Sequence, residues 1–109
     1  MLVAFSVAPS GGEDPNGSVH EAVAAAVRVV RDSGLPNRTD SMFTTIEGEW
    51  DEVFAVIKEA TDVVGDYGTR VSLVLKADIR PGYSGEIDAK IERLDRALER
   101  HEDSGFEAV

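Results

Sequence analysis

The order of strand-like and helix-like segments predicts an α+β protein. Short runs of strand formers alternate with two longer segments whose apolar residues recur at helical spacing, and the resulting order is β-α-β-β-α-β. This order is the ferredoxin-like arrangement, in which two helices cover one face of a four-stranded sheet. An extra helix follows the last strand. We expect one ferredoxin-like domain over residues 1–109, with residues 103–109 as a frayed tail.

The first strand and the first helix are predicted from composition and from a capping pattern. Residues 2–8 (LVAFSVA) are apolar and rich in strand formers, and residues 9–17 contain the Pro, Gly and Asn-Gly residues of a loop. Ser18 and Glu21 have the spacing of a capping box, which predicts a helix start. Gly34 and Pro36 predict the helix end. The apolar stripe between them contains Val19, Ala22, Val23, Ala26, Val27 and Val30.

The second half of the pattern begins with residues 37–48, which suit two short strands, about 37–42 and 43–48. A helix follows from Glu49 to Val64, with acidic residues in its first turn, where the helix dipole favours them. The last strand covers residues 70–80, and the extra helix about 84–102. The helical stripes are Val53, Val56, Ile57, Ala60 and Val64, and then Ile87, Ile91, Leu94 and Leu98.

Charge and composition exclude several function classes. The net charge of −10 opposes binding to nucleic acid phosphates or to anionic lipid. The chain has no cysteine, which excludes disulfides, thiolate metal sites and a cysteine nucleophile. The first residues lack the pattern of a signal peptide, and no run approaches the ~20 apolar residues of a membrane span. We expect a cytoplasmic protein with no membrane or nucleic acid partner.

Alternation within the strands places a set of polar residues on the sheet face that the two helices leave open. Thr44 should face the helices together with Met42 and Ile46, so Thr45 and Glu47 should face the open side. In the last strand, Val71, Leu73, Leu75, Ala77 and Ile79 form one face, and Ser72, Val74, Lys76 and Asp78 form the other. Ala4, Ser6 and Ala8 of the first strand join the open face.

These residues allow two interpretations. Hydroxyl groups and carboxylates around Ser6, Thr45, Glu47, Lys76 and Asp78 can bind a heterocycle that carries an amine or a positive ring. A contact between subunits explains the same residues, since an open sheet face needs a cover. Lys76 and Asp78 would then form an ion pair at the sheet edge, and Ser6 would allow close sheet packing.

Trp50 opens the second helix and also has two interpretations, as a core or interface anchor or as a residue that stacks on a ligand. The sequence contains no nucleophile–base pair and no set of metal ligands at suitable spacing. We therefore predict no catalytic residue, no metal site and no cofactor, and we do not expect an enzyme.

Three stretches resemble the YkoF-related family of thiamine-binding proteins. They are FSVAPSG (residues 5–11), MFTTIEGEWDEVFAVIKEA (residues 42–60) and VSLVLKADIR (residues 71–80), within a similarity that runs from about residue 2 to 100. The T-x-x-E-G stretch from Thr44 to Gly48 is its most specific part. The chain departs from the pattern at Phe43, where a small residue is expected. A ring at this position would narrow a pocket.

The resemblance implies a ferredoxin-like fold that assembles into dimers or tetramers through sheet faces. It also implies binding of thiamine, or of its hydroxymethyl-pyrimidine moiety, without catalysis. Ser6, Thr44 and Glu47 are the ligand-binding residues that it carries over, whereas Thr45, Trp50, Lys76 and Asp78 come from the strand-face argument. The alternative hypothesis is an oligomeric structural or regulatory module without a metabolite ligand.

Overall fold

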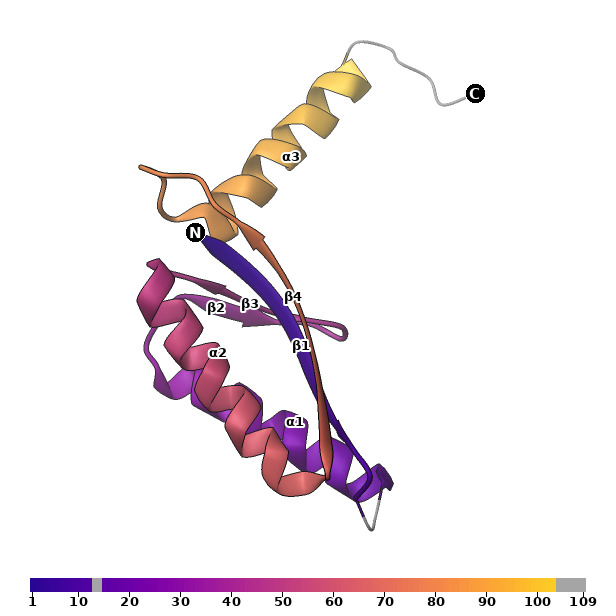
Figure 1. The fold of residues 1–109 in the computed structure, drawn as a ribbon. Coiled ribbons are helices and arrows are strands. Elements are labelled where there is room, and N and C mark those ends of the chain that lie inside the picture. The colour runs from indigo at the N-terminus through magenta and orange to yellow at the C-terminus, as the bar shows by residue number, and fades with distance from the viewer. Residues whose placement is uncertain (13–14, 104–109) are drawn as a thin grey trace.

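The computed structural model describes residues 1–12 and 15–103, and its elements follow the predicted order (Figure 1). One antiparallel sheet has the strand order β2-β3-β1-β4. The strands are β1 (Leu2–Ser10), β2 (Asn37–Thr39), β3 (Thr44–Glu47) and β4 (Arg70–Asp78). The helices are α1 (Pro15–Asp32), α2 (Trp50–Val64) and α3 (Glu86–Asp103), with a short 3-10 helix, η1 (Gly65–Tyr67), before β4. The predicted ferredoxin-like fold is confirmed.

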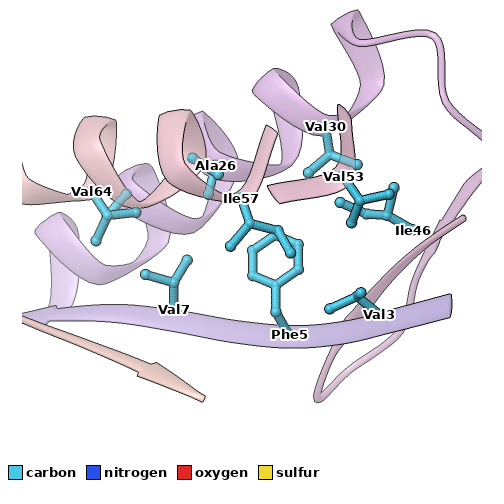
Figure 2. Packing of buried hydrophobic residues seen from close by; sticks show 11 residues of the cluster. Val3, Phe5, Val7, Ala26, Val30, Ile46, Val53, Ile57 and Val64 are labelled. Atoms are coloured by element: carbon cyan, nitrogen blue, oxygen red, sulfur yellow. The ribbon is translucent and has the colours of Figure 1, made fainter. Parts of the chain in front are cut away.

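The core lies between one face of the sheet and the pair of helices α1 and α2 (Figure 2). The odd-numbered residues Val3, Phe5 and Val7 of β1 point toward the helices, as the two-residue period of a strand requires. The predicted helical stripes supply the opposite wall, through Ala22, Ala26, Val30, Val53, Ile57, Ala60 and Val64. This packing leaves the other face of the sheet free of α1 and α2.

Several predicted boundaries are wrong in the first half of the chain. β1 extends to Ser10, and α1 begins at Pro15, three residues before the predicted cap at Ser18. Proline is favoured at the first position of a helix for two reasons. Its ring fixes φ near the helical value, and the backbone N–H that it lacks would have no partner within the helix at that position. The local Ser18–Glu21 pattern therefore lies inside the helix.

The two short middle strands are confirmed, but a turn over residues 40–43 shortens both of them. The carboxylate of Asp40 accepts hydrogen bonds from the backbone amides of Met42 (2.8 Å) and Phe43 (2.9 Å). These two bonds hold the pKa of Asp40 below its ordinary value. Met42 is 71% exposed, so the prediction that it faces the core is wrong.

Helix α3 leaves the body of the molecule (Figure 1). Its first turn lies near the open sheet face, and the rest projects outward, so the radius of gyration is 17.3 Å. A compact chain of this length has a radius of about 13 Å. Ile91, Leu94 and Leu98 are therefore about half exposed, at 47%, 58% and 53%. Of the predicted tail, residue 103 belongs to α3, and residues 104–109 lie outside the described residues.

No helix within residues 1–12 and 15–103 is long and apolar enough to cross a membrane.

Candidate functional site

Strand register confirms the predicted faces of the sheet. Ala4 of β1 lies between Thr45 of β3 and Lys76 of β4, so these three side chains share one face. Leu2 lies in the same way between Glu47 and Asp78. Because Val3 and Phe5 face the helices, this set faces the open side.

A cavity of about 320 Å³ lies between this face and the start of α3. We call it the open-face cavity. Three predicted residues line it, namely Thr45, Lys76 and Asp78. Its other lining residues are Leu2, Ala4, Arg38, Asp40, Glu86, Ile87, Lys90 and Ile91. The apolar members can hold a flat ring, and the polar members offer a hydroxyl, three carboxylates and three cationic groups.

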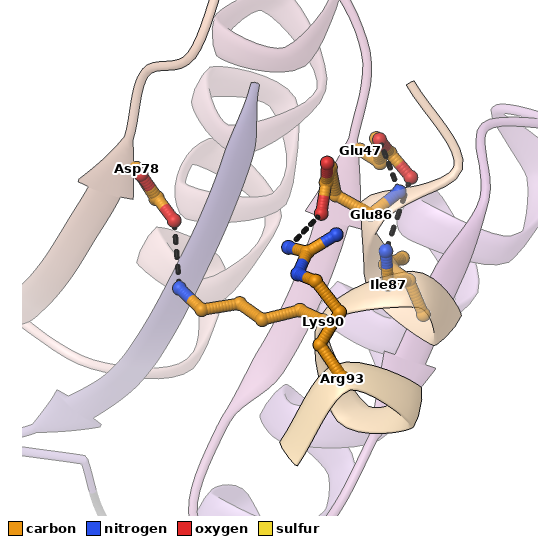
Figure 3. Close-up of polar contacts among 6 residues, drawn as sticks. All are labelled: Glu47, Asp78, Glu86, Ile87, Lys90 and Arg93. Carbon is orange, nitrogen blue, oxygen red and sulfur yellow. Dashed lines mark hydrogen bonds and ion pairs between the residues drawn. The ribbon is translucent and has the colours of Figure 1, made fainter. Parts of the chain in front are cut away.

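Glu47 holds α3 beside the cavity instead of lining it (Figure 3). Its side chain is only 6% exposed, and each carboxylate oxygen accepts one backbone N–H from the first turn of α3. The donors are the amides of Glu86 (2.9 Å) and Ile87 (3.3 Å). These amides have no partner within the helix, and their partial positive charge favours a carboxylate. Glu47 therefore fixes the helix that forms one wall of the cavity.

Ion pairs also connect α3 to the sheet. Lys90 donates to the carboxylate of Asp78 at 2.7 Å (Figure 3), and Arg38 of β2 pairs with Asp88 at 2.6 Å. The hydrogen bond and the charge of Lys90, helped by Lys76, hold the pKa of Asp78 below its ordinary value. Asp78 is therefore an ionised acceptor in the cavity at neutral pH.

Ser6 and Thr44 lie in a different place. β1 continues beyond the end of β3, and a second hollow of about 190 Å³ there is lined by Ser6, Phe43 and Thr44 among others. Thr44 is 7% exposed, and its hydroxyl lies 3.1 Å from that of Thr39. The ring of Phe43 was expected to narrow the ligand pocket. Phe43 does not line the open-face cavity, so its ring does not narrow that cavity. The predicted ligand-binding residues are thus divided, because Ser6 and Thr44 line the second hollow, whereas the open-face cavity is lined by Thr45, Lys76 and Asp78.

Trp50 is 55% exposed at the start of α2, and its ring lies 4.7 Å from the ring of Phe54, measured between centroids. It is not among the residues that line the open-face cavity. Within the single chain, Trp50 is neither a core anchor nor part of that cavity's wall.

Sequence reasoning missed four of the seven polar residues that line the open-face cavity. Arg38 and Asp40 come from β2 and the turn after it, and Glu86 and Lys90 come from α3. The alternation within β2 was too short to assign a face to Arg38. The charges of α3 had the pattern of a solvated helix surface, and no local signal indicates where that helix docks.

A family model described as "Thiamine-binding protein" matches residues 3–95. The chain belongs to the thiamine-binding protein family. A UPF0045 protein of Mycobacterium bovis is 51% identical to it over 104 residues, which cover 94% of this chain and 98% of the relative. The expected family resemblance is therefore confirmed.

Solved structures confirm the fold of this family member. A hypothetical protein of Methanocaldococcus jannaschii superposes with a TM-score of 0.74 at 29% identity, over 86% of this chain and 94% of that one. A Thermotoga maritima protein, assigned provisionally to thiamine biosynthesis or salvage, gives a TM-score of 0.68 at 24% identity, over 84% and 96% of the two chains. At that identity, the second likeness shows a common fold.

Proposed function

We propose that this protein binds thiamine, or its hydroxymethyl-pyrimidine moiety, in the open-face cavity without transforming it. The observation that carries the proposal is the set of ionised and hydroxyl groups gathered over an apolar floor at Leu2 and Ala4. Membership of the thiamine-binding protein family supports the choice of ligand. The volume of about 320 Å³ is at the small end of the range for ligand pockets, which suits one or two small rings.

The chemistry of the lining matches the two halves of such a ligand. An aminopyrimidine offers an amine that donates to carboxylates such as Asp78 and Asp40, and ring nitrogens that accept from the hydroxyl of Thr45. A positively charged thiazolium is balanced by the same carboxylates. Ile87 and Ile91 of α3 would cover the ring from the side opposite the sheet.

The ion pair between Asp78 and Lys90 does not prevent this role. Both side chains are about half exposed, at 47% and 58%, and exposed ion pairs contribute little to stability. Lys90 has a flexible stem and can turn toward solvent when a cationic or amine-bearing ligand reaches Asp78. On binding, the carboxylate of Asp78 would exchange the ammonium group of Lys90 for the amine or the positive ring of the ligand.

The test is isothermal titration of the protein with thiamine and, separately, with hydroxymethyl-pyrimidine. We expect saturable binding by the unmodified chain and an affinity lower by about tenfold or more in Asp78→Asn, which keeps the shape and removes the charge. Asp62→Asn is the matched control, because Asp62 also accepts from a lysine, Lys58 at 3.0 Å, but lies on α2. The control should bind like the unmodified chain.

Two outcomes would contradict the proposal. If neither compound gives binding heat or a thermal shift, thiamine and hydroxymethyl-pyrimidine are excluded as ligands. If Asp78→Asn and Asp62→Asn lose the same affinity, the loss comes from the change in net charge and not from the cavity. Chromatography of the ligand after prolonged incubation tests the non-catalytic part, because any product would make the protein an enzyme.

A second candidate is an oligomeric module without a metabolite ligand. The observation in its favour is the half-exposed stripe of Ile91, Leu94 and Leu98 on α3, which a second subunit could cover. This candidate predicts a stable oligomer in sedimentation and no response to thiamine. Ligand binding by a monomer would count against it.

A further inference from the structure

A second cavity adjoins the open-face cavity and is lined by positively charged side chains. It has a volume of about 260 Å³ and shares four lining residues with the open-face cavity, namely Leu2, Asp78, Glu86 and Lys90. We call it the basic cavity. Its other lining residues are Met1, Arg80, Tyr83 and Arg93.

The lining of the two cavities has the opposite charge to the protein as a whole. Five of the 11 Lys and Arg residues of the chain line them, but only three of its 21 Asp and Glu residues do. The local charge is therefore +2, or +1 when Asp88, the partner of Arg38, is included, against −10 for the whole chain. Exposed charges more than about 8–10 Å away are largely screened, so the local excess acts on a ligand. The cations are Arg38, Lys76, Arg80, Lys90 and Arg93, and the acids are Asp40, Asp78 and Glu86.

Arg80 forms no ion pair with any residue that the structure describes. Its guanidinium instead lies over the ring of Tyr83, with the central carbon 3.6 Å from the ring centroid. Such a cation–π contact holds the guanidinium against the ring and leaves the N–H groups at its edge free to donate. Arg80 therefore brings an unneutralised fork of donors to the basic cavity.

Lys90 and Arg93 also keep free donors. They lie three residues apart on α3 and thus on one side of the helix (Figure 3). Lys90 gives one hydrogen bond to Asp78, and Arg93 gives one to Glu86, both at 2.7 Å. An ammonium or a guanidinium group has more N–H donors than this one bond uses. An acceptor with several oxygens can therefore bind both side chains while their ion pairs persist.

A phosphate monoester has the charge and the acceptors that these donors require. It has a charge of about −1.5 to −2 at neutral pH, and each of its terminal oxygens is a strong acceptor. Arginine binds phosphate through two parallel N–H bonds, and lysine binds it as a point charge. Side chains must supply these donors, because Glu47 already takes up the amides of Glu86 and Ile87 at the start of α3.

We propose that the protein binds its ligand as a phosphate monoester, with the ring in the open-face cavity and the phosphate on Arg80, Lys90 and Arg93 in the basic cavity. The inference rests on the proposed function, since it adds a phosphate to the same thiamine or hydroxymethyl-pyrimidine. It also removes a mismatch of charge. A thiazolium alone would enter a lining that is positive overall, whereas the phosphate makes the total charge of the ligand negative.

The first test compares each compound with its own phosphate ester. The unmodified chain is titrated calorimetrically with thiamine, thiamine monophosphate, hydroxymethyl-pyrimidine, its monophosphate and inorganic phosphate. We expect each ester to bind about tenfold or more tightly than the free compound, and this advantage to shrink as the ionic strength rises from about 0.05 M to about 0.5 M. Inorganic phosphate should bind far more weakly than either ester, because it lacks the ring.

The outcomes separate this inference from the proposed function. Equal or weaker binding of the esters would overturn the inference and leave the proposed function intact. Binding of the esters without binding of the free compounds would support the inference and refute unphosphorylated thiamine as the ligand. Inorganic phosphate that binds as tightly as the esters would overturn the placement of one ligand across both cavities.

The second test measures the ratio of the two affinities, ester to free compound, in variants. Arg80→Gln should lower this ratio by about tenfold, and Arg80→Lys, which keeps the charge but loses the fork, should lower it less. Arg28→Gln is the matched control, because Arg28 is an exposed arginine on α1, away from both cavities. A general loss of folded protein lowers both affinities and cancels in the ratio. An unchanged ratio in Arg80→Gln, or an equal fall in Arg28→Gln, would contradict the inference.

Discussion

Replacing Glu47 tests whether this residue is a helix anchor or a ligand contact. In Glu47→Gln the side chain keeps its size and one acceptor oxygen, but an NH₂ group replaces the other oxygen and then faces a backbone N–H of α3. One of the two bonds, to Glu86 or to Ile87, is lost, and the negative charge at the helix start disappears. The structure therefore predicts weaker docking of α3.

The magnitude follows from the two bonds. A hydrogen bond to a charged group contributes about 1.5–3 kcal/mol, and a donor left unpaired in a buried place adds a cost of similar size. The bond at 2.9 Å is well formed and the bond at 3.3 Å is weak. We expect a loss of about 2 kcal/mol in the free energy that holds α3 on the sheet, which corresponds to about 30-fold more opening.

Hydrogen exchange read by mass spectrometry measures this opening directly. Exchange in the first two turns of α3 should rise about 30-fold in Glu47→Gln, and exchange in β1 and α2 should stay nearly unchanged, because the core does not include α3. Glu59→Gln, at an exposed position of α2, is the control. Unchanged protection of α3 in Glu47→Gln would refute the anchoring role, and a matching rise in the core would refute local opening.

Three further predictions concern the fold and the turn beside the cavity. Phe5→Ala should lower the free energy of unfolding by about 3–5 kcal/mol, measured in urea, because Phe5 is 3% exposed in the centre of the core; a loss below about 1 kcal/mol would contradict that packing. Gly68→Ala should destabilise by about 1–3 kcal/mol, since its new Cβ would clash with the carbonyl oxygen of Ser10. Gly65→Ala is the control, because its Cβ would meet nothing closer than 3.9 Å, and equal midpoints of thermal unfolding in the two variants would refute the close approach at Gly68. The pKa of Asp40 lies below its ordinary value of 3.8, so the ionised carboxylate stabilises the turn above about pH 4. This stabilisation is lost as the pH falls through 3.8 toward the pKa of the folded state. An NMR titration midpoint of the Asp40 carboxyl at or above 3.8 would contradict the prediction.

The sequence by itself determined the element order, the core and the two faces of the sheet. Val3, Phe5 and Val7 alternate with open-face residues, and the stripe of α2 recurs at helical spacing, so each face can be assigned from neighbours in the chain. These patterns are local, because the period of a strand or a helix spans only a few residues. For the same reason, Thr45, Lys76 and Asp78 could be placed together on the open face before any contact was known.

Only the tertiary structure decided how those faces become a site. Glu47 finds its partners 39 and 40 residues away, at the start of α3, and nothing near it in the sequence indicates that contact. The separation of Ser6 and Thr44 from the open-face cavity depends on how far β1 extends past β3. Both are long-range relations between elements, set by where helices and strand ends dock, and the short periodicities of the chain carry no information about them.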